Sequence, residues 1–349
     1  MRTNSTSPRI SLRDIAKRLG VSHVTVSLAL RDNPRISLTM REKVKAVAEE
    51  MSYRPDPMLA ALAHYRKDKK ETPVTASLAW INAWPEAEIL RHHREFDLYW
   101  EGAEQAAQKA GYRLEEFRQQ GEITPRRLDQ ILSSRGINGL LLPPHTYPPD
   151  WTGFPWEKYS VVKFGRSLQD PAAHVVTSNQ VGNTLLAYRK IRERGYERIG
   201  FVTDEQRAME SSTMFMAGYL FAQREHGMQE NIPILDVKAH CLHTCLPEIH
   251  AWIEQHALDA VITDLPGIPQ LLPETHPPER LGIAVTSILD GHADAGIDQN
   301  PREVGRVAFQ VLNSLIHDGA KGIPAIPHEL LVSGLWADGK SLPDRRQQG

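Results

Sequence analysis

The sequence predicts an α/β protein with three parts: a three-helix helix-turn-helix headpiece, a hinge helix, and a large domain of two lobes with parallel sheets. Three observations predict this fold. The chain has 349 residues, enough for two or three domains. Its N-terminal part reads as short helices joined by a tight glycine turn. The remainder alternates apolar strand-like runs with amphipathic helices, the pattern of parallel sheets.

The composition excludes several classes of protein. Hydrophobic residues make up 41% of the chain and charged residues 24%, the balance of a globular protein that buries a core. No run approaches the roughly 18 apolar residues of a membrane span, and the N-terminus lacks the apolar segment of a secretory signal. Two cysteines exclude a disulfide framework. We therefore expect a cytoplasmic protein with no membrane partner.

The net charge of −2 conceals an uneven distribution. Residues 1–70 contain 15 Lys and Arg against 7 Asp and Glu, whereas the remainder contains 26 against 36. A basic N-terminal part on an acidic body is typical of a chain whose N-terminal part alone binds a polyanion. A solvated charged surface would give the same balance of charges. The local sequence pattern is therefore needed to distinguish it from a polyanion-binding surface.

Residues 11–20 predict the first helix. Ser11 and Asp14 have the spacing of a capping box, and apolar residues recur along one face behind them. Gly20 is suited to end the helix in a left-handed conformation.

Two further helices complete the headpiece. Ser22 can cap a second helix over 23–30, and a third is expected after Ser37, with its inner face formed by Val44, Val47, Ala48 and Met51. Three short helices with a glycine turn between the first two make a helix-turn-helix unit.

The second helix has an inner and an outer face. Val26, Ala29 and Leu30 have the spacing that faces a small core. The outward side chains lie near the helix start: His23, Val24, Ser27 and Leu28, with Thr25 at the margin. A recognition helix presents its first turns to the major groove, and short hydroxyls suit phosphate oxygens. A helical hairpin that contacts another protein remains the alternative.

A short apolar helix is expected after the headpiece. The prolines of residues 53–57 break the chain, and 58–63 are helix-prone but too few to be stable alone. A basic linker follows at 65–71. Such a segment can become ordered on DNA, pair with its copy in a dimer and insert an apolar side chain into the minor groove.

Residues 11–63 resemble the headpiece and hinge of the LacI/GalR family of bacterial transcription regulators. The resemblance rests on the segments LRDIAKRLGVSHVTVSLAL, SLTMREKVKAVAEEMSYRP and DPMLAALA. It implies double-stranded operator DNA as a partner, with His23, Val24 and Leu28 reading bases, Thr25 and Ser27 on phosphates, and Leu62 opening the central base step. The expected DNA-binding set also includes Ser22, Arg31 and Tyr53.

Leu28 departs from the family pattern, because many members have Arg at this position. An Arg there binds guanine through two hydrogen bonds, for about 1–3 kcal/mol of discrimination. Leucine offers only methyl groups, which could contact thymine, whereas His23 and Arg31 remain possible hydrogen-bonding readers. We therefore expect an operator that deviates from the family's usual half-site.

The acidic body predicts two series of strands and helices around a cleft. Expected strands include TASLAWI, 137–143, 160–165, HVVTSN, 198–203, 259–264 and 282–288, and HVVTSN is expected to open the second series. Ligands in such folds bind at the carboxyl ends of the strands. The expected divisions are a headpiece at 1–56, a hinge and linker at 57–72, the two-lobed domain at 73–340 (lobes 73–172 with 300–325, and 173–299 with 326–340), and a tail at 341–349.

The body resembles the periplasmic-binding-protein-like domain of the same family, through GAEQAAQKAGYRL, ILSSRGINGLLL, KIRERGYERIGFV and GIDQNPREVGRVAFQVL. The resemblance implies a homodimer that binds a small molecule, such as a sugar, between its lobes. Binding there would change the hinge geometry and thus operator affinity, an allosteric coupling of typically 1–3 kcal/mol. Repression is the family's usual outcome.

The candidate effector-binding residues match the family unevenly. Sugar-responsive relatives usually carry an Arg at the position of Phe215, so the hydroxyl clamp is missing there. Arg207 could replace it, although an exposed loop residue is the plainer interpretation. Asp264 matches the family's strand-end acidic residue, with a helix N-cap as the alternative, and Asp290 is a weaker candidate.

Two tryptophans lie at the end of the first expected strand. Trp80 and Trp84 could stack on a sugar or another ring, but tryptophans at such positions more often pack in the core. Together with Phe215 they hint at a ligand that is not a simple anionic metabolite.

Metal binding and catalysis have weak support. The segment His240-Cys241-Leu242-His243-Thr244-Cys245 carries metal-capable side chains, but no second spaced pair completes a zinc site. A phosphate-binding loop, a dinucleotide fingerprint, a GxSxG motif and an HExxH motif are all absent from the sequence. We expect no cofactor and no enzyme activity. The alternatives are a transport-type solute-binding protein and a sugar-processing enzyme fused to a helix-turn-helix.

Overall fold

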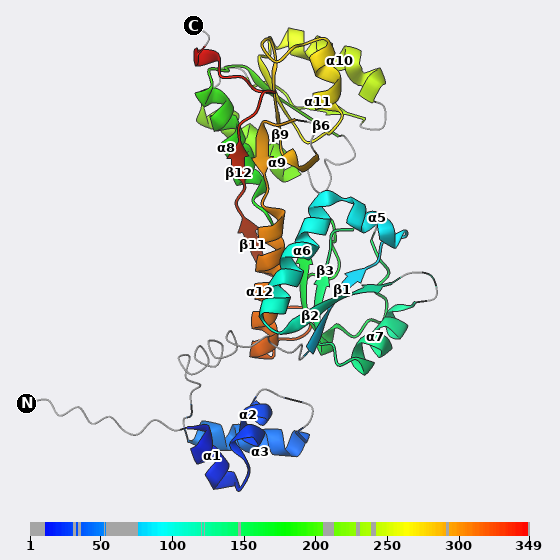
Figure 1. Ribbon diagram of the computed structural model, residues 1–349, viewed down its shortest axis with the longest axis vertical. Helices are drawn as coiled ribbons and strands as arrows, with labels where there is room; N and C mark the ends of the chain where they lie inside the picture. Colours follow the sequence, from blue (N-terminus) through cyan, green and yellow to red (C-terminus); the bar gives the residue numbers. More distant parts are fainter. Residues whose placement is uncertain are drawn as a thin grey trace, which may run out of the picture.

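The computed structural model shows a small helical headpiece followed by two α/β lobes (Figure 1). The residues that it describes are 11–30, 33, 36–51, 53, 76–119, 121, 123–145, 148–204, 213–227, 231–238, 242–290 and 293–347.

The headpiece consists of α1 (Leu12–Leu19), α2 (His23–Leu30) and α3 (Leu38–Glu50), at the positions that the sequence predicts. Helices this short are not stable alone, so they depend on a shared core. The buried core residues come from all three helices: Ile15, Ala16, Val26, Ala29, Val44 and Ala48. Leu30, Val47 and Met51 pack against this core, as expected.

The turn between α1 and α2 follows from local chemistry. The carboxylate of Asp14 accepts hydrogen bonds from the backbone N–H and the hydroxyl of Ser11, both at 2.7 Å, which caps α1. Gly20 lies in the left-handed region with φ 66°, where a side chain would be strained. This conformation lets Val21 donate its N–H to the carbonyl of Ala16 at 3.1 Å, so the chain turns sharply into α2.

The first lobe is built on a six-stranded parallel sheet in the order β11-β5-β4-β3-β1-β2. Its strands are β1 (Ala76–Asn82), β2 (Tyr112–Arg118), β3 (Gly139–Leu142), β4 (Ser160–Phe164), β5 (His174–Ser178) and β11 (Glu329–Val332). Its helices are α5 (Ala87–His92), α6 (Arg94–Lys109), α7 (Pro125–Ser134) and α12 (Pro301–Asp318), with a 3-10 turn η1 (Trp156–Lys158).

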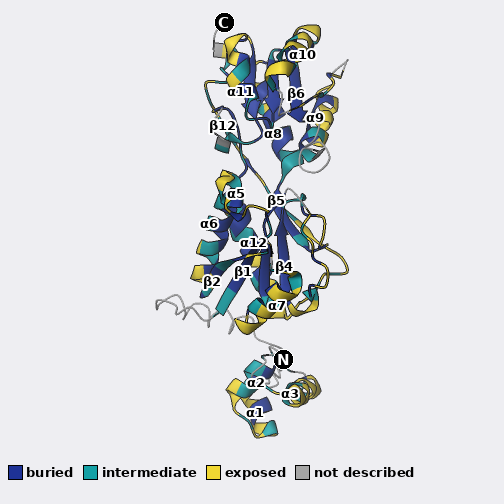
Figure 2. Ribbon diagram, turned by 90° about the vertical axis from the view of Figure 1, so that its right-hand side faces the viewer, coloured by how far each residue is buried: buried dark blue, intermediate teal, exposed yellow. Residues whose placement is uncertain are grey.

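Helices cover both faces of this sheet. Leu78 and Trp80 of β1 belong to the core that includes α6 and α12, whereas Ala79 and Ile81 belong to the core that includes α7. Side chains of a strand alternate between faces, so a central strand covered on both sides is apolar throughout. Figure 2 shows the result, with buried strands inside and exposed residues on the outer helix surfaces.

The second lobe repeats this architecture with the order β12-β10-β9-β8-β6-β7, in which β12 alone is antiparallel. Its strands are β6 (Ile199–Asp204), β7 (Leu235–Val237), β8 (Ala260–Thr263), β9 (Gly282–Val285), β10 (Gly296–Asp298) and β12 (Leu335–Ala337). Its helices are α8 (Gln180–Glu193), α9 (Thr213–Glu225), α10 (Leu242–Gln255) and α11 (Ile268–Leu271), with 3-10 turns η4 (Leu272–Glu274), η5 (Ile288–Asp290) and η6 (Arg345–Gln347).

Strand pairing corrects the expected lobe boundaries. The segment HVVTSN is β5 and pairs with β4, so it ends the first series rather than opening the second. The strand β11 pairs with β5 and also belongs to the first lobe, although 326–340 was expected in the second. Both pairings join segments distant in sequence, which local pattern does not reveal.

The expected tail is also part of the second lobe, at least through residue 347. Leu342 is 1% exposed and belongs to the core that includes α8 and α9. Ile283 of β9 donates its N–H to the carbonyl of Ser341 at 2.7 Å, and the Tyr196 hydroxyl donates to the carbonyl of Pro343 at 2.9 Å. The segment 341–343 therefore packs and hydrogen-bonds at the N-terminal ends of strands in the second sheet.

The helices α6 and α12 pack at very close range. A Cβ atom at Gly102 would overlap the backbone carbonyl of Arg302, and one at Gly305 would overlap that of Tyr99. The two glycines therefore permit the backbones to touch. None of the helices in the described ranges, α12 included, is long and apolar enough to cross a membrane.

Candidate DNA-binding and effector sites

The first turn of α2 offers a free surface. His23 and Val24 are exposed, with Val24 at 53%, whereas Val26 and Ala29 are buried in the headpiece core. Ser27 and Leu28 are half-buried. The outer face predicted from the sequence is therefore present, and it is widest at the N-terminal end of the helix, where a recognition helix meets base edges.

Ser22 caps α2, as predicted. Its hydroxyl oxygen accepts the backbone N–H of Thr25 at 3.0 Å, and the two hydroxyls lie 2.9 Å apart. The Thr25 hydroxyl is thus already engaged with Ser22, and it is half-buried. A phosphate contact by Thr25 would have to be made together with this cap or in exchange for it.

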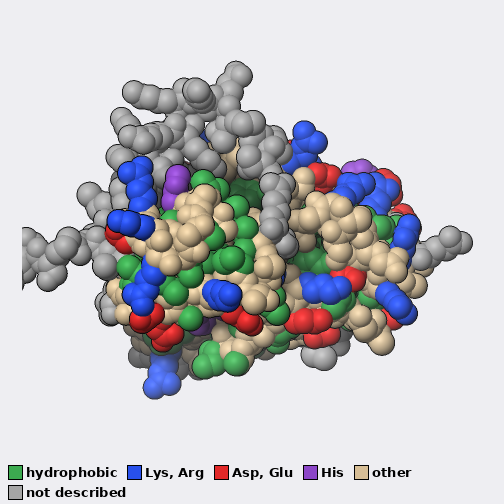
Figure 3. Space-filling view, turned by 90° about the horizontal axis from the view of Figure 1, so that it is seen from below, with side chains coloured by type: hydrophobic (Ala, Val, Ile, Leu, Met, Phe, Trp, Pro, Cys, Tyr) green, Lys and Arg blue, Asp and Glu red, His purple; other side chains and the backbone are tan. Residues whose placement is uncertain are grey.

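The described part of the headpiece has a mixed surface charge. Six of its residues are Lys or Arg, and the other nine of the fifteen within residues 1–70 lie outside the described residues. Arg18 is paired with Glu50, which neutralises part of the charge. In Figure 3, seen from the headpiece end, the Lys and Arg side chains of the described residues are interspersed with acidic ones.

Of the remaining predicted DNA-binding residues, one packs in the headpiece and two lie outside the described residues. The ring of Tyr53 packs against the headpiece core, and its N–H donates to the carbonyl of Ala48 at 2.9 Å. Tyr53 thus closes the end of α3. Arg31 and Leu62, with the whole hinge segment, lie outside the described residues.

The two sheets place the candidate effector site. In each lobe the second strand in chain order lies on one side of the first and the third strand lies on the other. The connections that follow the parallel neighbours β1 and β3 therefore run to opposite sides of the sheet, and so do those that follow β6 and β8. Ligands of open α/β sheets bind at the carboxyl ends of strands at such switch points. Asn82 and His145 lie there in the first lobe, and Thr203 and Asp264 in the second.

Two residues of the predicted effector set are core residues in this structure, which for Trp80 is the packing alternative to stacking. Trp80 is 0% exposed and packs edge-on against Trp100, at 5.5 Å between ring centroids. Phe215 is 6% exposed and packs in the core beneath α8 and α9. Neither ring therefore offers an exposed face on which a ligand could stack.

Trp84 lies just beyond β1 but is also buried. Its indole N–H donates to the carbonyl of Pro144 at 2.8 Å, and its ring packs against His93 and Phe96. The hydrogen bond ties the segment after β1 to the segment after β3. The geometry therefore gives Trp84 a structural role, which was the alternative to stacking.

The two acidic candidates differ in whether the structure describes their side chains. Asp264 follows β8 and is half-buried, and it accepts the hydroxyl of Thr203 at 3.1 Å, so it lies at the switch point of the second lobe. Asp290 lies in η5, and its side chain is outside the described residues, as is the whole of Arg207. Of the predicted effector set, Asp264 and the buried Trp84 have described side chains at the expected edge, and Asp264 is the one that carries a charge.

Sequence reasoning missed His145 at the switch point of the first lobe. The residue is 3% exposed, and its Nε2 accepts the N–H of Ala83 at 3.1 Å. Burial lowers the pKa of His145 to about 4, so the ring is neutral near pH 7. A lone His after an apolar strand carries no specific signal, and only the strand order brings it beside Ala83.

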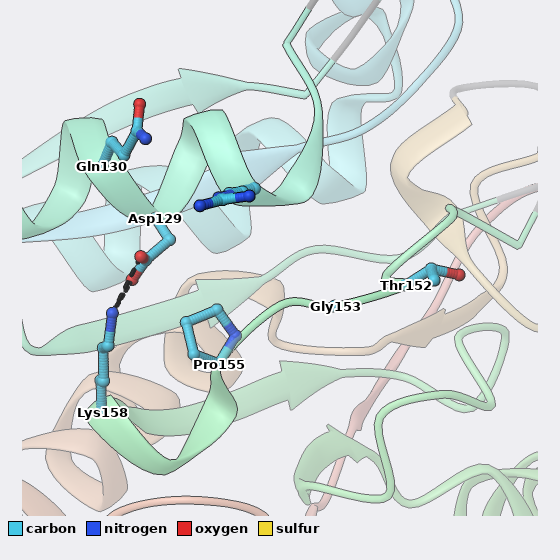
Figure 4. A pocket seen from close by; sticks show the side chains of 7 residues that line it. Asp129, Gln130, Thr152, Gly153, Pro155 and Lys158 are labelled. Atoms are coloured by element: carbon cyan, nitrogen blue, oxygen red, sulfur yellow. Dashed lines mark hydrogen bonds and ion pairs between the residues drawn. The ribbon is translucent and has the colours of Figure 1, made fainter.

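A pocket of about 680 Å³ lies on the first lobe, between α7 and the chain that leads to β4 (Figure 4). Lys158 donates to both carboxylate oxygens of Asp129 at 2.9 Å across it, so these two charges neutralise each other. The pocket is lined by residues outside the switch point: Arg126, Asp129, Gln130, Thr152, Gly153, Pro155 and Lys158. We therefore do not assign the effector to it.

The structure describes only part of the His/Cys segment. His243 and Cys245 lie in α10, whereas His240 and Cys241 are outside the described residues. Among described residues, no three His, Cys, Asp or Glu side chains converge in a way that could hold a metal ion.

Comparison with known proteins agrees with this architecture. Residues 11–56 match the sequence model of the bacterial regulatory proteins of the lacI family. The chain is 24% identical to the transcriptional regulator GalS of Salmonella typhimurium over 63% of its own length and 61% of that protein. It is 25% identical to the transcriptional repressor PurR of Pectobacterium atrosepticum over 62% of its length and 60% of that protein. The alignments thus span about three fifths of these relatives.

Solved structures with the same fold cover most of the chain. A complex of the transcriptional regulator CelR with cellobiose matches 95% of this chain and 100% of its own, at 19% identity and a TM-score of 0.57. The lac repressor dimer bound to operator and the anti-inducer ONPF matches 96% and 99%, at 15% identity and 0.54. The regulator CcpA of Weissella paramesenteroides with bound glucose matches 77% and 99%, at 17% identity and 0.57.

These findings define a protein with a helix-turn-helix headpiece and a two-lobed α/β body of the periplasmic-binding-protein-like type. The headpiece belongs to the lacI family of bacterial regulatory proteins, and the body has the fold of regulators of that family.

Proposed function

We propose that this protein is a sequence-specific, DNA-binding transcriptional regulator, and a repressor, whose operator affinity is controlled by a small molecule bound between its lobes. The observation that carries the proposal is the free N-terminal face of α2, with His23 and Val24 exposed on a helix-turn-helix that matches the lacI family. A helix presented in this way can enter the major groove and contact base edges.

The proposed effector is a sugar or a related metabolite. The matched CelR and CcpA structures contain cellobiose and glucose. In this chain, Asp264 places a half-buried carboxylate at the switch point of the second lobe, whereas Asn82, His145 and Thr203 are buried and hydrogen-bonded within the protein. A carboxylate accepts hydrogen bonds from hydroxyls, which supports a polyhydroxylated ligand.

The proposed assembly is a homodimer on a pseudo-palindromic operator, in the cytoplasm. A dimer places two recognition helices about one helical turn apart, and its two-fold symmetry matches a palindromic site. The relatives are regulators rather than enzymes, which supports the absence of catalytic activity.

A gel-shift experiment tests the proposal. The full chain and a chain without residues 1–72 are titrated against DNA fragments from the gene's own genomic neighbourhood. We expect the full chain to shift one fragment and the truncated chain to shift none. If neither protein binds any fragment, the proposal fails and a solute-binding or enzymatic role must be considered instead.

The effector is tested separately by thermal unfolding with sugars, sugar acids and nucleobases. A ligand that binds the folded state raises the unfolding temperature by mass action. We expect a sugar to raise it in both the full and the truncated chain, because the site lies in the body. A rise caused only by nucleobases would contradict the proposed ligand class.

A further inference from the structure

The chain crosses between the lobes three times, and the three crossings lie against one another. The first runs from β5 into α8 at Ser178, and the second from β10 into α12 at Asn300. The third joins β11 to β12 through Ser333 and Gly334. Any rotation of one lobe against the other must be absorbed by backbone dihedrals in these crossings.

One side chain connects the first crossing to the third. Asn183 lies in the first turns of α8 and is 2% exposed. Its amide nitrogen donates to the hydroxyl oxygen of Ser178 at 2.8 Å, and its carbonyl oxygen accepts the backbone N–H of Gly334 at 2.7 Å. A backbone bond from Asn179 to the carbonyl of Val332, at 2.8 Å, runs alongside.

The second crossing is held against the third. The side-chain amide of Asn300 donates to the carbonyl of Ser333 at 2.9 Å. A Cβ atom at Gly334 would lie 2.6 Å from a methyl of Ile297 and 2.8 Å from the carbonyl oxygen of Asp298. The third crossing therefore lies directly on the end of β10, at the residue that Asn183 binds.

We propose that Asn183 is a positioning residue that ties the crossings into a single hinge and so limits how the lobes move relative to each other. Both hydrogen bonds of its carboxamide are buried, and a buried polar group that loses its partner destabilises the folded state. The three crossings therefore cannot change their backbone conformation independently of one another. The regulatory consequence rests on the proposed function: a loosened hinge weakens the coupling between effector and operator.

Distance measurements between spin labels test the hinge directly in the full-length chain. Cys241 and Cys245 are replaced by Ser, and labelled cysteines are placed at the exposed Arg126 of α7 and Glu248 of α10, one in each lobe. Double electron–electron resonance then gives the interlobe distance distribution. We expect a narrow distribution for this reference protein and a broader one for Asn183→Ala.

The matched control is Gln223→Ala. Gln223 is also a fully buried carboxamide with two hydrogen bonds, to the N–H of Ile232 at 2.7 Å and to its carbonyl at 3.0 Å, but all within the second lobe. We expect it to lower the unfolding temperature, as Asn183→Ala does, without broadening the interlobe distances. Equal broadening by both variants, or by neither, would overturn the proposal.

Ser178→Ala is the milder test if Asn183→Ala does not fold. It removes one of the two side-chain bonds and leaves the bond to Gly334, so we expect an intermediate width. A width equal to that of the reference would contradict the hinge role. Because these measurements use neither DNA nor effector, their outcome is independent of the proposed function.

Discussion

The imidazole of His145 accepts a hydrogen bond from the backbone N–H of Ala83, at 3.1 Å between Nε2 and the amide nitrogen. The bond joins the segments that follow β3 and β1, on either side of the switch point of the first lobe. A ring nitrogen that accepts a hydrogen bond carries no proton, so this contact exists only while His145 is neutral.

This contact predicts a pH-dependent stability. Burial lowers the pKa of His145 from 6.5 to about 4, so the unfolded chain binds more protons between these values. The contribution of His145 to the free energy of unfolding is therefore complete above about pH 6.5. It falls as the pH drops towards 4, by up to about 3 kcal/mol. Urea unfolding at several pH values measures this loss.

The variant His145→Gln is the control, because its amide oxygen can replace the ring acceptor without titrating. The pKa values of His174 and His276 are also lowered by burial, so some pH dependence is expected to remain. The prediction fails if the variant and the original protein lose stability equally between pH 6.5 and 4.

Gly102→Ala is expected to destabilise the first lobe. The added methyl would overlap the backbone of Arg302, so α6 and α12 must move apart, for about 1–3 kcal/mol. Gln105→Ala, on the exposed face of the same helix, should stay within about 0.5 kcal/mol. Chemical unfolding of both variants checks this, and equal stabilities would mean that the helices are not in close contact.

The headpiece could be predicted from the sequence almost residue by residue. Its signals are local: Ser11 and Asp14 cap α1, Gly20 turns the chain and Ser22 caps α2. The apolar central strands of the lobes were equally visible. Edge strands such as β2, with the sequence YRLEEFR, have too few apolar residues for the same signal, and β11 and β12 are identified only by their pairing.

The effector site is harder to predict, because it depends on which face of the sheet a side chain points to and on which strands are neighbours. Trp80 lies within a central strand that helices cover on both sides, so either orientation buries it. Asp264 and His145 are brought to the switch points by strand order, which is a long-range property. The sequence pattern indicated where strands end, but not which strands would be neighbours.

Leu342→Ala tests whether the C-terminal segment is part of the second lobe. The side chain is 1% exposed in a core, and removing such a leucine costs about 2–5 kcal/mol. Leu335→Ala is the matched control, since Leu335 is 63% exposed and should lose about 0.5 kcal/mol or less. If both variants unfold at the same denaturant concentration, the segment does not contribute to the core.

Leu28→Arg is expected to change the operator preference. Leu28 lies one turn after Val24 on α2 and is half-buried, with methyl groups as its only contact surface. An Arg can bind guanine through two hydrogen bonds, so a guanine-containing half-site should gain about 1–3 kcal/mol relative to the original. Binding selection from a randomised operator checks this, and an unchanged preference would exclude position 28 as a base reader.

The most direct measurement compares two variants that add the same charge at two exposed headpiece positions, Val24→Asp on α2 and Ala46→Asp on α3. Each is titrated against the fragment bound in the gel shift, with fluorescence anisotropy as the readout. If α2 enters the major groove, Val24→Asp abolishes specific binding while Ala46→Asp leaves it nearly intact, because only the carboxylate at position 24 would lie against the negatively charged DNA and be repelled by it. Equal binding by the two variants would contradict the central claim that this face of α2 recognises DNA.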